Sequence, residues 1–69
     1  MKNYFATNLK RLRKSRKMRQ ADVAVIVKKS QAIVSAWETG IREPLVEDVY
    51  VLSKLFGVSM EDLYFTDLS

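Results

Sequence analysis

The stretch that decides the fold is QADVAVIVKKSQAIVSAWETG, residues 20–40. Apolar residues recur at three- and four-residue steps over residues 20–27, which predicts a short helix. Ser30 is a favoured N-cap residue, so a second helix is expected to begin there and to end near Thr39. Gly40 suits the left-handed position that often follows a helix. The stretch therefore predicts two short helices joined by a tight turn.

Three more helices are expected around this pair. Residues 4–16 combine apolar residues at helical spacing with basic residues between them. A fourth helix begins at about Leu45 and ends before Gly57, and Ser59 caps a short fifth helix. The apolar residues that repeat along the fourth helix are Val46, Val49, Leu52, Leu55 and Phe56. No useful stretch alternates with a period of two, so residues 1–69 are expected to form one all-α domain, a compact five-helix bundle.

The composition argues against several kinds of chemistry. The chain has no cysteine and no histidine, which removes disulfides, thiolate chemistry and the commonest metal ligand and general base at neutral pH. It also lacks a glycine-rich phosphate loop and a pair of inward carboxylates, so no enzyme activity, metal or cofactor is expected. No stretch approaches the roughly 20 apolar residues of a membrane span, and the amino end lacks a secretion signal. The cytoplasm is the expected compartment.

The charges are divided unevenly along the chain. The formal net charge is +4, but residues 1–42 carry +9 and residues 43–69 carry −5. A basic front joined to an acidic back suggests a protein that offers one face to a polyanion. A solvated helix surface is the alternative explanation of the same charges.

Several short motifs follow one another at set spacings. They are Leu9-x-x-Leu12-Arg13, Gln20-x-x-Val23-Ala24, Ser30-x-x-x-Val34-x-x-Trp37-Glu38-x-Gly40, Pro44 and Leu55-Phe56-Gly57-Val58-Ser59-Met60-x-x-Leu63. None is specific alone, but the ordered set is. Over roughly residues 5–65 the chain resembles the phage repressor and Cro-like (XRE-type) helix-turn-helix regulators. The resemblance implies double-stranded DNA as the partner, with the helix that starts at Ser30 lying in the major groove.

The resemblance also implies a role for individual residues. Gln31, Ala32 and Ala36 occupy base-reading positions, and a glutamine can make a bidentate contact to adenine. The residues expected near phosphates are Arg19, Gln20, Lys28, Lys29, Ser35, Thr39 and Arg42. Gln20 is also expected to brace the recognition helix. Arg13 and Glu38 match a pair that forms a partly buried salt bridge in the family.

The chain departs from the family pattern at three places. Lys28 and Lys29 stand where a glycine and an apolar residue are usual, so either Lys28 adopts a left-handed backbone or the turn differs. Arg19 replaces a serine or threonine cap, which predicts a less firm start of the second helix. Val25 and Ile26 replace polar residues. Burial in a rotated helix, harmless exposure and contact with a protein partner would each explain them.

The sequence thus predicts a sequence-specific transcription regulator, a repressor that binds as a homodimer to a two-fold related operator. The residues expected at the dimer interface are Tyr50, Met60, Tyr64, Phe65 and Leu68. An antitoxin or antirepressor, for which DNA binding is secondary and a protein partner contacts Val25 and Ile26, is the alternative.

Overall fold

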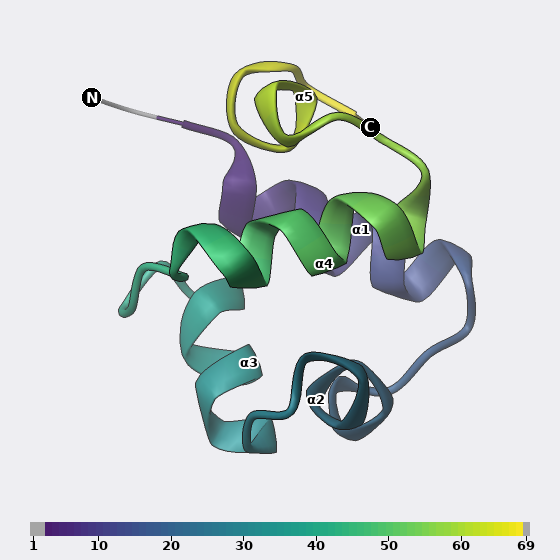
Figure 1. Cartoon of the computed structure of the whole chain (residues 1–69), viewed down its shortest axis with the longest axis vertical. Coiled ribbons are helices and arrows are strands. Elements are labelled where there is room, and N and C mark those ends of the chain that lie inside the picture. Colours follow the sequence, from purple (N-terminus) through teal and green to yellow (C-terminus); the bar gives the residue numbers. More distant parts are fainter. Residues whose placement is uncertain (1–2, 69) are drawn as a thin grey trace.

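The computed structural model describes residues 3–68, which form helices and no strand. The helices are α1 (Phe5–Ser15), α2 (Gln20–Val27), α3 (Gln31–Glu38), α4 (Val46–Phe56) and α5 (Met60–Phe65). In Figure 1, α5 lies above the pair formed by α1 and α4, and α2 and α3 lie below it. The described residues thus confirm the all-α prediction, with α1 one residue shorter at each end than expected. No helix within them is long and apolar enough to cross a membrane.

Two kinds of cap start the helices. Ser30 and Ser59 accept hydrogen bonds from backbone N–H groups of α3 and α5, at 3.2 and 2.9 Å. In α2 the cap works in reverse, because the Asp22 carboxylate accepts the backbone N–H of Arg19 at 2.8 Å. Asp48 does the same for Leu45 at the start of α4, at 3.0 Å. The expected weak start of α2 is therefore wrong: a carboxylate one turn inside the helix supplies the cap and also favours the helix dipole.

The cap on α2 should make stability depend on acid. Hydrogen bonds from the Arg19 side chain and then its backbone lower the pKa of Asp22 below 3.8. A lowered folded-state pKa gives stability that is present above pH 3.8 and is lost as the pH falls further. Asp22→Asn keeps a neutral acceptor, so its melting temperature should fall less steeply in this range than that of the wild type. Parallel melting curves against pH for the two proteins would contradict this.

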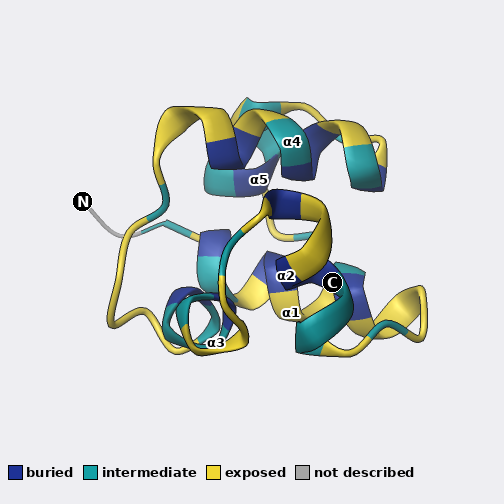
Figure 2. Cartoon of the chain, turned by 60° about the horizontal axis from the view of Figure 1, so that its bottom comes forward, coloured by how far each residue is buried: buried dark blue, intermediate teal, exposed yellow. Residues whose placement is uncertain are grey.

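The core is formed where the inner sides of the helices meet. Its fully or almost fully buried apolar residues are Phe5, Leu9, Val23, Val34, Trp37, Val49, Leu52, Phe56 and Leu63. Figure 2 shows these dark blue positions on the sides of the helices that face one another. The Phe5 ring stacks on Tyr64 at 5.2 Å between centroids and meets the edge of Trp37 at 6.5 Å. Trp37 thus lies in the core, as its place in α3 predicts.

Asn8 ties the carboxyl end of the described chain to α1. The side chain is completely buried, and its amide donates to the carbonyl oxygens of Asp62, Leu63 and Thr66 at 3.3, 2.9 and 2.7 Å. Its oxygen accepts the backbone N–H of Leu68 at 3.0 Å. One amide therefore satisfies four backbone groups beyond the reach of any helix ladder.

The apolar residues of α4 and α5 are placed differently from the sequence expectation. Val46 continues the apolar repeat of α4, yet 74% of it is exposed, because the first turn of α4 extends past the core. Tyr64 and Met60, expected at a dimer interface, pack partly against the core instead. Tyr50 and Phe65 remain about half exposed.

Candidate nucleic-acid interface

The turn between α2 and α3 closes on a strained residue. Lys28 has φ 59° and ψ 43°, so the first of the two alternatives for this turn is confirmed. The amides of Lys28 and Lys29 then donate to carbonyl oxygens of Val25 and Ala24, at 3.3 and 2.9 Å. A left-handed lysine costs about 1 kcal/mol more than a glycine. The turn keeps the shape that glycine usually supplies and adds a positive charge at its tip.

The α3 helix divides its side chains between the core and the surface. Val34 and Trp37 are buried and anchor it, while Gln31 and Ala32 are exposed on its first turn. Ala36 is partly exposed one turn further on. The two other positions on this surface are Ser35, partly exposed, and Thr39, whose hydroxyl donates to backbone carbonyl oxygens of Ser35 and Ala36 at 3.2 Å. The expected base-reading residues therefore share one accessible side of α3.

A buried ion pair joins α1 to the end of α3. Arg13 donates to both carboxylate oxygens of Glu38, at 2.7 and 3.0 Å, and a third donor reaches the carbonyl oxygen of Met18 at 2.8 Å. Only 2% of the Glu38 side chain is exposed. The hydrogen bond to Glu38 raises the pKa of Arg13 against the opposing effect of burial. The expected salt bridge is confirmed.

Gln20 connects this ion pair to the recognition helix. Its side-chain Nε2 donates to Glu38 Oε1 at 3.1 Å, and its Oε1 accepts from Gln31 Nε2 at 3.3 Å. The predicted bracing of α3 by Gln20 is therefore present. Because Gln20 is the first residue of α2 and Gln31 the first of α3, the contact also brings the two positive helix ends together.

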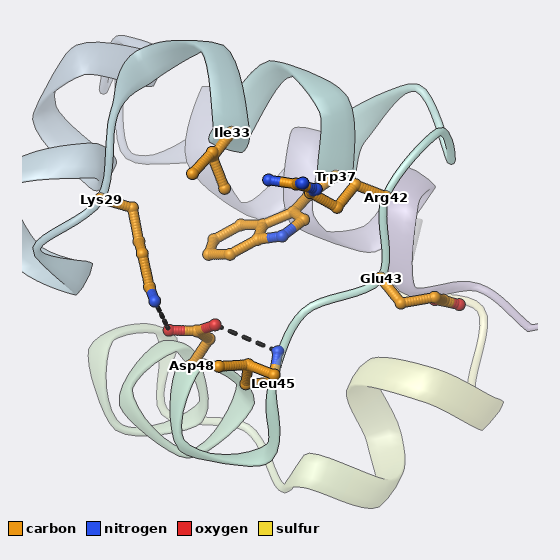
Figure 3. Close-up of a pocket in the computed structure, with 7 residues that line it drawn as sticks. All are labelled: Lys29, Ile33, Trp37, Arg42, Glu43, Leu45 and Asp48. Atoms are coloured by element: carbon orange, nitrogen blue, oxygen red, sulfur yellow. Dashed lines mark hydrogen bonds and ion pairs between the residues drawn. The ribbon is translucent and has the colours of Figure 1, made fainter.

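Lys29 has a contact that the sequence did not predict. Its ammonium lies 3.8 Å from the buried carboxylate of Asp48, across an open cavity of about 220 Å³. Figure 3 shows Lys29 directed into this cavity and toward α4, with Ile33 and Trp37 on the opposite wall. We therefore leave Lys29 out of the proposed phosphate contacts. No signal in the sequence pairs Lys29 with Asp48, because 19 positions separate them.

Internal partners occupy much of the basic charge of the chain. Arg11 pairs with Asp67 and Arg19 with Asp22, at 2.8 and 2.9 Å. Arg16 donates to the last carbonyl oxygens of α4, at 3.2 and 3.3 Å. Beside the recognition helix, Lys28 and Arg42 are exposed cations, and no ion pair joins either to a described carboxylate.

Val25 and Ile26 lie on the outer side of α2. Val25 is 77% exposed and Ile26 40% exposed. Burial by a rotated α2, one of the three explanations offered for these residues, is therefore excluded. Harmless exposure and contact with a partner both remain open.

Comparisons with known proteins agree with this geometry. A family model described as helix-turn-helix matches residues 9–63. The crystal structure of the P22 c2 repressor in complex with a synthetic operator is 32% identical, with a TM-score of 0.85 over 91% of this chain and 96% of that one. A transcriptional regulator from Listeria innocua is 25% identical, with a TM-score of 0.89 over 93% of this chain and 60% of that one.

An enzyme also contains a similar domain. The hydroxypropylphosphonic acid epoxidase from S. wedmorenis is 30% identical, with a TM-score of 0.77 over 87% of this chain. The match covers only 32% of the epoxidase, so it concerns one part of a larger protein. Within residues 3–68, no three acidic side chains gather as a metal ion would require. A sequence comparison with curated proteins found no significant match.

The family model covers most of the chain, and the operator-bound repressor is similar over nearly its whole length. The chain belongs to the XRE-type helix-turn-helix family of DNA-binding transcriptional regulators.

Proposed function

We propose that this protein is a sequence-specific repressor that binds as a homodimer to a two-fold related operator. The observation that carries the proposal is the exposed Gln31 on the first turn of α3, held by Gln20. The similarity to an operator-bound repressor supports it. A DNA-binding regulator acts in the compartment that contains the DNA, which for a bacterial or phage protein is the cytoplasm.

In this proposal, contacts to bases and to phosphates come from different residues. Gln31 makes the hydrogen-bonded base contact, and the methyl groups of Ala32 and Ala36 contact thymine methyl groups. The phosphate contacts come from Arg19, Gln20, Lys28, Ser35, Thr39 and Arg42, which set the register of the protein on the duplex. Because two of the three base-reading residues are alanines, DNA shape and half-site spacing contribute much of the specificity.

Two alanine substitutions separate these roles. Gln31→Ala should relax the preference at one base pair, at a cost of about 1–3 kcal/mol for the preferred base, and leave the other positions unchanged. Arg42→Ala should weaken binding to all sequences about equally and reduce the salt slope by about 1. Binding isotherms on a set of single-base variants, each at several salt concentrations, measure both effects. A base-selective loss with Arg42→Ala would contradict its assignment.

The dimer is proposed to form through the exposed apolar side of α4. Val46 and Tyr50 are one helical turn apart and so share a face, and both are exposed. Ile41 and Leu45, in the loop before α4, are exposed beside its first turn. These residues extend the predicted interface toward the loop, while Tyr64 and Met60 serve mainly the core.

A pair of matched valines tests this interface. Val46→Lys should raise the dissociation constant of the dimer about tenfold or more, because it removes roughly 1.5 kcal/mol of apolar burial and places a charge there. Val25→Lys is the control, since Val25 is as exposed as Val46 but lies on α2. Sedimentation equilibrium without DNA measures both variants. Equal dimerisation of the two would exclude this side of α4.

The exposure of Val25 and Ile26 favours a second candidate function. In this alternative, α2 contacts a protein partner, as in an antitoxin or antirepressor, and DNA binding is secondary. A stoichiometric partner retained at high salt from the native host, and lost with Val25→Lys, would favour the second function. Operator binding without such a partner would favour the first.

A further inference from the structure

Four side chains form an unbroken chain of hydrogen bonds from the core to the proposed base-reading position. Arg13 donates to Glu38, Gln20 donates to Glu38, and Gln31 donates to Gln20. Its inner end is buried, and its outer end is the exposed side chain of Gln31. The direction of each hydrogen bond in this chain follows from the charge at its inner end.

Glu38 can only accept hydrogen bonds. Arg13 holds its carboxylate with two donors and stays protonated at every ordinary pH, so the pair is stable only with Glu38 ionised. An ionised carboxylate has no proton to donate. The end of the Gln20 amide that lies 3.1 Å from Glu38 Oε1 must therefore be the NH₂ group.

The orientation of Gln20 then determines that of Gln31. A primary amide has a donor at one end and an acceptor at the other, so a Gln20 that donates to Glu38 turns its oxygen toward α3. That oxygen only accepts, and Gln31 must meet it with its own NH₂ group, at 3.3 Å. One N–H and the oxygen of Gln31 are left for the groove, in a single fixed order.

We propose that the buried Arg13–Glu38 pair sets the base preference of Gln31 through Gln20. This inference rests on the proposed function, in which Gln31 reads a base. An oxygen and an N–H side by side match the N6 donor and N7 acceptor of adenine, and the reversed amide presents them in the wrong order. Arg13 and Glu38 are thus positioning residues for sequence recognition.

Gln20→Met tests the relay, because methionine has a similar length but neither donates nor accepts in the same way, and the ion pair is left intact. The control is Ser35→Ala, which removes a proposed phosphate contact outside the relay. Affinity is measured for the selected DNA site and for the same site with another base pair opposite Gln31. Gln20→Met should reduce the ratio of the two affinities about fivefold or more, whereas Ser35→Ala should leave it unchanged. An unchanged ratio in Gln20→Met would overturn the proposal.

A measurement without DNA separates failure of the relay from failure of the proposed function. In the NMR spectrum of the free protein, the Gln31 NH₂ protons should differ from those of an exposed glutamine and should shift toward them in Gln20→Met. If the wild-type signals already match an exposed glutamine, the relay is wrong. If the relay is present but selected DNA shows no base preference, the proposed function fails, and the role of the relay in base choice fails with it.

Discussion

Glu38→Ala is expected to leave most of the protein unfolded. The substitution strands a guanidinium that is almost fully buried, and breaking a buried pair in this way costs about 3–5 kcal/mol. A hydrophobic core in a chain of this size rarely supplies more than about that amount. Trp37 is the single tryptophan and is buried, so its fluorescence during urea unfolding measures the change in the free energy of unfolding.

Two control proteins make the cause specific. The double variant Arg13→Met with Glu38→Leu replaces both charges by apolar groups and should recover much of the stability. Arg11→Ala breaks an ion pair whose side chains are about half exposed, and it should cost less than about 1 kcal/mol. A Glu38→Ala protein within 1 kcal/mol of the wild type would contradict the account of the pair.

Asn8→Asp is expected to destabilise the protein by about 3 kcal/mol or more at neutral pH. The change replaces the donor that serves three carbonyl oxygens by a second acceptor at a completely buried position. A carboxyl in these surroundings has a folded-state pKa above its unfolded value. Its protonated form can again donate one hydrogen bond, so the difference from the wild type should shrink as the pH falls.

Urea unfolding of Asn8→Asp at neutral and acid pH tests both statements. Thr7→Ala is the matched control, because Thr7 is the neighbouring, exposed residue of α1, and its loss should change stability by less than about 0.5 kcal/mol. If Asn8→Asp were as stable as the wild type at neutral pH, the carbonyl contacts of Asn8 would not matter for folding.

The helices were predictable because their signals are local. Ser30 and Ser59 mark the starts of α3 and α5, and Gly40 and Gly57 adopt the positive φ expected after α3 and α4. The accessible side of α3 follows from the positions of its buried residues in the helical repeat. The Arg13–Glu38 pair lay outside such rules, and only the resemblance to known regulators indicated it.

The remaining features depend on contacts between distant parts of the chain. Asn8 occurs among the apolar residues on the inner side of α1, a pattern that signals a buried polar group, but its partners lie more than 50 positions away. Lys29 and Asp48 likewise meet only after α4 folds back on the turn. For Val46, the helical repeat predicts a face, yet the length of the core decides that the first turn of α4 is uncovered.

Selection of bound sequences from random duplex DNA, followed by affinity measurements against salt concentration, tests the central claim most directly. The proposed function predicts an enriched sequence with two-fold related half-sites about 34 Å apart, and an affinity for it far above that for unrelated DNA. A steep salt dependence with no enriched sequence would instead show binding to phosphates alone, and it would contradict the claim that this protein is a sequence-specific regulator.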